Sequence, residues 1–264
     1  MNHIDDPVQA LIDRKIAEGG ELRVLEAGAG SRTHIQLGPN AYVVGIDVSE
    51  EGLRKNTGLH EKILGDLETY PLDPSSFDII FCWDVLEHLK HPEKALHSFQ
   101  RAIREGGLIV LGGPVVTSLK GTITKYTPYW FHDLVYQHLL LRRPTGGSGH
   151  PFPTYMRYSI SPNSLHHFAR KNHLSVEYFT VYEEMMQVRL KQRFWIINFL
   201  FRTVGPIVRF LSFGIIDPTI TDFIMVLGKT RETTLDCNFA RPTNPPDLTL
   251  PFALCTAIHV AVLP

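Results

Sequence analysis

The sequence predicts an α/β protein built on a doubly wound sheet, and two observations carry that prediction. Short apolar runs that end in turn residues alternate with segments of helical spacing, which is the pattern of parallel strands joined by crossover helices. The chain has 264 residues, of which 44% are hydrophobic and 20% are charged. A chain of this size and composition is large enough to bury one full core.

The first half of the chain supplies three expected helices and five expected strands. The first helix covers 7–18 and stops at two glycines. Ser49 is placed to cap a second helix over 49–56, and Pro92 opens a third over 92–105. The strands are expected over 22–28, 42–49, 61–66, 76–84 and 106–113.

The regular alternation stops between 115 and 160, where the chain is aromatic, basic and rich in glycine and proline. A segment this long between sheet elements predicts a substrate lid inserted after the fifth strand. The sequence then predicts a capped helix, a strand, a strongly apolar helix and a last strand, over 161–172, 174–183, 185–213 and 221–230. A proline-rich and then apolar tail covers 232–264.

Composition narrows the class of protein. The formal net charge is −1, and no run of lysine or arginine forms a nucleic-acid footprint. Three widely spaced cysteines fit neither a disulfide scaffold nor a zinc ribbon, which favours a reducing interior. The first residues lack a signal-peptide core, and no apolar stretch reaches the roughly 20 residues of a spanning helix. These features predict a soluble, cytoplasmic protein.

A glycine loop follows the first expected strand in "RVLEAGAGSR". Gly28 and Gly30 let the backbone turn sharply and approach a ligand closely. A dinucleotide fingerprint would carry a third glycine where this chain has Thr33. The acid Glu26, just before the loop, would repel a pyrophosphate but attract the cationic amino-acid end of S-adenosylmethionine.

Acids also follow the next two expected strands. Asp47 lies 17 residues past Gly30, where its carboxylate is placed to accept both hydroxyls of a ribose. Asp66 is placed to accept from an adenine amino group. The alternative interpretation is that these acids only cap helices, but packing alone does not account for acids after three successive strands.

The stretches "VLEAGAG", "VVGIDVS", "LGDLE" and "FDIIFCWDVLEHLKHPEKALHSFQRAIREGGLIVLGGP" together resemble the class I S-adenosylmethionine-dependent methyltransferases. They are most similar to the small-molecule group that includes the ubiquinone-biosynthesis O-methyltransferases. The resemblance covers 22–114 and implies a Rossmann-like, seven-stranded, mostly parallel sheet whose last strand is antiparallel. It implies S-adenosyl-L-methionine as the cofactor and says little about the residues beyond Pro114.

The sequence pattern predicts a domain plan, and the resemblance implies a set of cofactor contacts. One methyltransferase domain would cover 1–231, as a cofactor half (20–114), a lid (115–160) and a second half (161–231). Glu26, Gly28 and Gly30 would hold the methionine part, while the remaining contacts would come from Asp47, Val48, Asp66, Leu67, Trp83, Asp84 and His88.

A metal site is an alternative at "DVLEHL", where some ubiquinone-pathway relatives hold a divalent cation. Asp84, Glu87 and His88 fit such a set in residue type. Glu-His after this strand also occurs in relatives described without metal, where it shapes the turn. We therefore expect no metal here.

The acceptor decides whether a general base is needed. A phenol or alcohol has a pKa far above 7 and needs one, whereas a carboxylate is already ionised. The candidate catalytic bases are His88, His132 and His150. Arg142, Arg143 and Arg157 are candidates to anchor an acceptor carboxylate, although solvated surface charge is the better explanation for any single one.

Two apolar features predict partners. An aromatic stripe lies within the lid and consists of Tyr126, Tyr129, Trp130, Phe131 and Tyr136. It suits a wall for a hydrophobic or aromatic acceptor, and it also suits a small satellite core under the lid. The apolar helix over 185–213 is expected to bury against the sheet or a second copy, with a membrane surface as the third option. If the helix buries against a second copy, the protein forms a homodimer through this helix or through the tail.

The sequence thus predicts an S-adenosylmethionine-dependent methyltransferase of secondary metabolism that acts on a small molecule. Oxygen is the expected atom by analogy with the family. An NAD-dependent oxidoreductase and a catalytically inactive methyltransferase-like scaffold are the alternatives.

Overall fold

The computed structural model describes the chain over 6–33, 37–118, 121, 153–213 and 217–230. These residues fall within one compact unit that spans Met1–Glu232. Most of the expected lid and the whole tail over 232–264 lie outside the described residues, so the expectations for them stay predictions.

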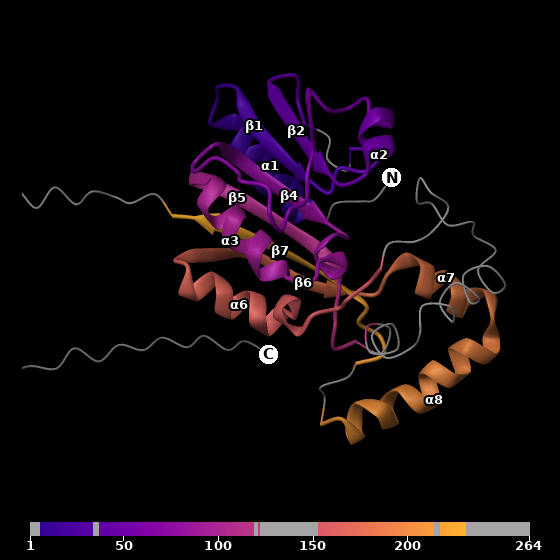
Figure 1. Ribbon diagram of the computed structural model, residues 1–264. Helices are drawn as coiled ribbons and strands as arrows, with labels where there is room; N and C mark the ends of the chain where they lie inside the picture. The colour runs from indigo at the N-terminus through magenta and orange to yellow at the C-terminus, as the bar shows by residue number, and fades with distance from the viewer. Residues whose placement is uncertain (1–5, 34–36, 119–120, 122–152, 214–216, 231–264) are drawn as a thin grey trace, which may run out of the picture. The chain divides into compact units, whose positions relative to one another are not determined.

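Seven strands form one sheet in the order β3-β2-β1-β4-β5-β7-β6 (Figure 1). β1 to β5 pair in parallel, while β7 pairs antiparallel with both β5 and β6. The strands are β1 Leu22–Ala27, β2 Ala41–Asp47, β3 Glu61–Leu64, β4 Phe77–Trp83, β5 Ile103–Pro114, β6 Leu174–Tyr182 and β7 Asp222–Lys229. This order confirms the doubly wound sheet with an antiparallel last strand.

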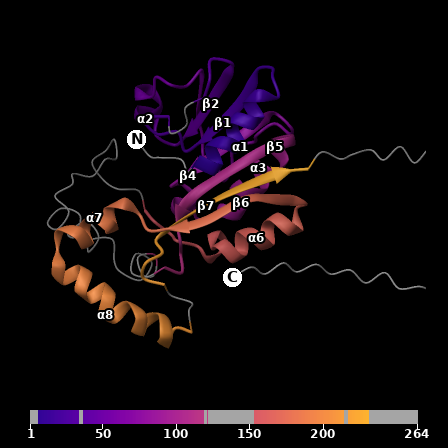
Figure 2. The same cartoon turned by 180° about the vertical axis from the view of Figure 1, so that it is seen from behind.

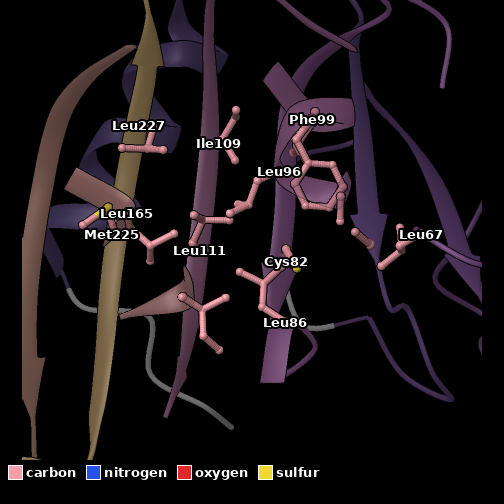
Figure 3. Packing of buried hydrophobic residues seen from close by; sticks show 14 of the residues in the cluster. Leu67, Cys82, Leu86, Leu96, Phe99, Ile109, Leu111, Leu165, Met225 and Leu227 are labelled. Atoms are coloured by element: carbon pink, nitrogen blue, oxygen red, sulfur yellow. The ribbon is translucent and has the colours of Figure 1, made fainter. Parts of the chain in front are cut away.

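Successive side chains of the central strands enter two different cores, because strand residues alternate between faces. In β4, Ile80 and Cys82 belong to one buried cluster, and Ile79 and Phe81 to the other. The first cluster, part of which Figure 3 shows, includes side chains of α3 (Pro92–Ala102) and α6 (Pro162–Lys171). The second includes side chains of α1 (Asp6–Ala17). Helices therefore cover both faces of the sheet (Figures 1 and 2).

Local signals set the ends of the helices. The Ser49 hydroxyl accepts from the Gly52 N–H and caps α2 (Glu50–Lys55), as expected. The Ser161 hydroxyl caps α6 through the Ser164 N–H, and Pro92 occupies the first turn of α3. Short 3₁₀ turns, η1 (Leu86–His88) and η2 (Tyr158–Ile160), lie before α3 and α6.

Two boundaries differ from the expectation. β5 begins at Ile103 rather than at Gly106, because Ile103 pairs with Phe77 and draws the chain into the sheet three residues early. The single helix expected over 185–213 is two helices, α7 (Met185–Arg193) and α8 (Trp195–Leu211). The backbone of Phe194 is extended, which ends one helix and starts the next.

Candidate functional site

The reversal of strand order between β1 and β4 brings several carboxyl-end loops together. In open α/β sheets, ligands bind at this edge, at the point where the winding reverses. The loop after β1 turns there through two residues with positive φ, Gly28 at +76° and Gly30 at +50°. A Cβ at Gly28 would lie 2.2 Å from a methyl carbon of Val85, so only glycine fits beside the β4 loop.

Asp47, the last residue of β2, ties the glycine loop to its neighbour. One carboxylate oxygen accepts from the Gly30 N–H at 2.8 Å, and the other accepts from the Ser49 N–H at 2.7 Å. The Gly28 N–H also donates to the carbonyl of Ile46 at 2.8 Å. The carboxylate is thereby fixed at the edge, and each of its oxygens keeps a further lone pair with which to accept from a ligand hydroxyl.

The other expected acids lie in different surroundings along the same edge. Glu26 is buried in β1, in register with Gly45 and Phe81 on the adjacent strands. Asp66 is exposed and accepts from the Glu68 N–H at 2.8 Å, so it also shapes its own turn.

Two apolar residues were expected beside these acids. Val48, next to Asp47, is exposed, whereas Leu67, next to Asp66, is buried in the core cluster that contains α3. The edge therefore presents Val48 to solvent.

The end of β4 packs closely on β5. The Trp83 ring stacks on Phe81, with centroids 5.6 Å apart, and covers Gly112, where a Cβ would meet the ring at 2.5 Å. Trp83 therefore packs on the face of the sheet that α1 covers. Asp84 adopts a φ of +52°, a left-handed conformation that aspartate tolerates better than most residues. Its N–H donates to the Gly112 carbonyl at 3.0 Å.

Glu87 and His88 form the polar part of η1. Glu87 is buried, and its carboxylate faces Gly113, where a Cβ would lie 3.5 Å from an oxygen. The His88 Nδ1 lies 3.0 Å from the carbonyl of Pro153, and its Nε2 lies 3.8 Å from a Glu87 oxygen. A carbonyl only accepts, so the Pro153 contact favours the neutral tautomer of His88 that carries its proton on Nδ1 and its lone pair on Nε2. Burial lowers the pKa of His88, against the opposing effect of the Pro153 hydrogen bond.

The chain returns to this edge just after the expected lid. The N–H groups of Tyr155 and Met156 donate to the Glu87 carbonyl at 2.8 and 3.2 Å. Arg157, a candidate anchor for an acceptor carboxylate, instead donates from Nε to the carbonyl of Lys90 at 3.0 Å. Sequence reasoning missed the Pro153 carbonyl as the partner of His88, because no local signal marks a contact across 65 residues.

The other candidates in the expected lid lie outside the described residues. They are His132 and His150 as bases, Arg142 and Arg143 as anchors, and the aromatic stripe from Tyr126 to Tyr136. Their roles stay predictions.

Over the described ranges, no group of three histidine, cysteine or carboxylate side chains is arranged to hold a metal ion. The His88 Nδ1 lies 3.0 Å from the Pro153 carbonyl, and one oxygen of each of Asp84 and Glu87 lies within 4 Å of a Cβ built at Gly113. That no metal binds here stays a prediction.

Two cavities lie away from these loops. One, of about 250 Å³, is bordered by α1, the start of β5 and the end of β7. The other, of about 440 Å³, is bordered by the start of β2 and by His60. Both are at the opposite ends of the parallel strands, away from Asp47 and His88.

Comparison with known proteins places the glycine loop and the acids within one family region. Residues 25–111 match a family model described as "Methyltransferase domain". The chain is 33% identical over 120 residues to the "Uncharacterized 37.1 kDa protein in transposon TN4556" of Streptomyces fradiae, which covers 41% of this chain and 34% of that protein. It is 23% identical over 179 residues to the ubiquinone biosynthesis O-methyltransferase of Nitrosomonas europaea, and the aligned region covers 64% of this chain and 67% of that protein.

The chain thus spans about a third of the first relative and two thirds of the second. Among solved structures, the YcgJ protein of Bacillus subtilis is similar with a TM-score of 0.50 and 18% identity, over 85% of this chain and 99% of that one. A likeness at this identity shows a shared fold.

Proposed function

We propose that this chain is a class I methyltransferase that uses S-adenosyl-L-methionine, with residues 25–111 in the methyltransferase domain, and that it methylates an oxygen of a small aromatic or hydrophobic molecule. The observation that carries the proposal is the Asp47 carboxylate, which is fixed at the switch point by the Gly30 and Ser49 N–H groups. We propose a cytoplasmic site of action, as the described thiol, Cys82, is free and buried.

The residues at the edge fit this cofactor in chemistry. Asp47 offers two negatively charged acceptors for the ribose hydroxyls, and charge-assisted hydrogen bonds of this kind are the strong ones. Glu26 supplies a carboxylate at the base of the glycine loop for a cationic amino group. Gly28 and Gly30 allow the loop its positive φ angles, and Asp66 would accept from the adenine amino group.

The residues around the glycine loop argue against the oxidoreductase alternative. A dinucleotide fold places its pyrophosphate on the N-terminus of the helix that follows the glycine loop. Thr33 stands in place of the third glycine, and its hydroxyl donates to Asn56 at 3.0 Å. Together with the carboxylate of Glu26, which would repel a pyrophosphate, Thr33 supports the methyltransferase proposal over a dinucleotide site.

His88 is the described residue best suited to act as the base. When bound, S-adenosylmethionine would supply an electrophilic methyl group, and its sulfonium sulfur would keep the electron pair of the broken C–S bond. The Pro153 carbonyl holds the His88 Nδ1–H, which directs the basic Nε2 to receive the proton of an acceptor hydroxyl. Because burial lowers its pKa, His88 is neutral and ready to accept a proton at pH 7.

We expect S-adenosylhomocysteine to stabilise the folded protein. At about 100 times its Kd, a ligand that binds only the folded state adds roughly 2.7 kcal/mol to the free energy of unfolding. Thermal unfolding with S-adenosylhomocysteine, with NAD and with neither measures this. A shift with NAD and none with S-adenosylhomocysteine would overturn the cofactor assignment.

We also expect methyl transfer to persist after exhaustive treatment with EDTA. Alignment of the acceptor and a sulfonium leaving group suffice for the displacement without a Lewis acid. The measurement is the transfer of labelled methyl from S-adenosylmethionine across a panel of phenols and carboxylic acids, before and after chelation. Activity that is lost on chelation and restored by Mg²⁺ or Zn²⁺ would make Asp84, Glu87 and His88 the ligand set.

A further inference from the structure

We propose that α8 binds the surface of an anionic lipid bilayer and lies along it. One side of this helix exposes several large apolar side chains. Six of them have between 45% and 81% of their surface exposed, namely Trp195, Phe199, Val204, Ile207, Phe210 and Leu211. Contiguous exposed apolar surface of this kind marks an interaction site.

The exposed residues share one half of the helix circumference. At 100° per residue, the arc from Trp195 through Phe199 and Ile207 to Val204 spans about 180°. The opposite side faces the protein, where Gly205 is buried near Pro218, and Phe201 and Val208 are partly buried. The apolar half is therefore presented as one face.

The helix pair is anchored to the rest of the protein. From α7, Gln187 donates to the carbonyl of Pro218 at 3.0 Å, and Lys191 pairs with Glu183. In α8, Arg209 pairs with Asp217 at 3.0 Å. Because β6 runs parallel to β1–β5, its last residue, Tyr182, lies at the edge that carries the candidate site. The helix pair leaves the sheet from that edge.

The charge of this segment matches an anionic surface. Between 185 and 213 there are five basic residues and no acidic one, Arg189, Lys191, Arg193, Arg202 and Arg209. Lys191 and Arg209 pair with Glu183 and Asp217, just outside this segment, which leaves Arg189, Arg193 and Arg202 as the basic residues to face an anionic surface. Basic residues near an anionic leaflet contribute about 1 kcal/mol each, while aromatic and aliphatic side chains enter the headgroup region.

Two other geometries fit less well. A symmetric dimer through this face would set one basic segment against its copy, and like charges oppose that contact. A spanning orientation needs about 20 apolar residues, and in the described ranges no helix is long and apolar enough to cross a membrane. A helix that lies in the interface buries its apolar face among the lipids and keeps its arginines near the anionic headgroups.

Vesicle co-sedimentation tests the proposal with the full chain. We expect binding to phosphatidylcholine vesicles that contain phosphatidylglycerol, weaker binding to pure phosphatidylcholine, and a loss of affinity as salt rises. Phe199→Ser and Phe210→Ser should each weaken binding at least about tenfold, because each removes a buried aromatic ring from the bound state. Arg202→Glu should weaken binding about fivefold or more on anionic vesicles alone.

Matched controls keep the test specific. Leu64→Ser removes an equally exposed apolar side chain from β3, and Arg101→Glu reverses an exposed charge on α3. Both should leave vesicle binding unchanged, and circular dichroism checks that every variant is folded. Brominated lipids should quench the wild-type fluorescence more than that of Trp195→Phe, which keeps an aromatic ring and removes the probe.

Several outcomes would overturn the proposal. One is no binding to anionic vesicles at low salt. Another is a dimer, measured by sedimentation, that Phe199→Ser dissociates, which would assign the face to a second copy. A third is Trp195 emission that is already blue-shifted and shielded from aqueous quencher without lipid, which would show that another segment of the chain covers the face.

Discussion

His88→Asn is expected to lower the rate of methyl transfer to a phenol by about 10²–10⁴. A phenol with a pKa near 10 is only about one part in a thousand ionised at pH 7, so a base must take its proton. Asparagine keeps an amide N–H where the Nδ1–H of His88 donates to Pro153, but it has no basic nitrogen. Loss of rate in His88→Asn as well as in His88→Ala separates proton transfer from packing.

The effect of His88→Asn should depend on whether the acceptor is a carboxylic acid or a phenol. A carboxylic acid with a pKa of about 4 is ionised throughout the neutral range, so its methylation should show no acid limb and little response to His88→Asn. For a phenol, kcat should fall as the pH drops below the working pKa of His88, which burial places below the ordinary value near 6.5. Equal rates for wild type and His88→Asn on a phenol would exclude His88 as the base.

The same pKa shift predicts how the stability of the folded protein depends on pH. Because the pKa of His88 is lower in the folded state, the unfolded chain binds the proton first as the pH falls. Stability is therefore complete above about pH 6.5 and declines as the pH falls toward the folded pKa, by at most about 1.4 kcal/mol per pH unit. Urea unfolding at several pH values should show this decline in the wild type and lose the His88 part of it in His88→Asn.

Asp47→Ala is expected to weaken cofactor binding by about 1.5–3 kcal/mol, or roughly 10- to 150-fold in Kd, because the lost hydrogen bonds are charge-assisted. The structure adds a second expected effect. Asp47 also accepts from the Gly30 and Ser49 N–H groups, so the variant should lower the free energy of unfolding by about 1–3 kcal/mol. Calorimetry with S-adenosylhomocysteine gives Kd, and urea unfolding of the ligand-free protein gives the stability.

Kd and the free energy of unfolding together show whether Asp47 contacts the cofactor or only stabilises the glycine loop. Glu51→Gln removes an exposed acid from α2, near Asp47 in sequence, and should leave Kd unchanged. A folded Asp47→Ala protein with lower stability but unaltered Kd would show that Asp47 only holds the glycine loop.

The sequence alone determined the elements whose signals are local. Ser49 and Ser161 cap their helices and Pro92 opens another, because these effects depend on neighbours within one turn. The apolar runs indicated buried strands, since both faces of the central strands are covered. The resemblance over 22–114 implied seven strands and an antiparallel last strand, which the spacing of the apolar runs does not fix by itself.

Only the tertiary structure decided which distant groups meet. Pro153 accepts from His88 across 65 residues, and Gly30 donates to Asp47 across 17, because the sheet brings the loops at its carboxyl edge together. The extended backbone at Phe194 divides the apolar segment, and the contacts near Pro218 leave one half of α8 exposed. Helical spacing showed that α8 has an apolar side, but which side faces solvent depends on packing against elements remote in sequence.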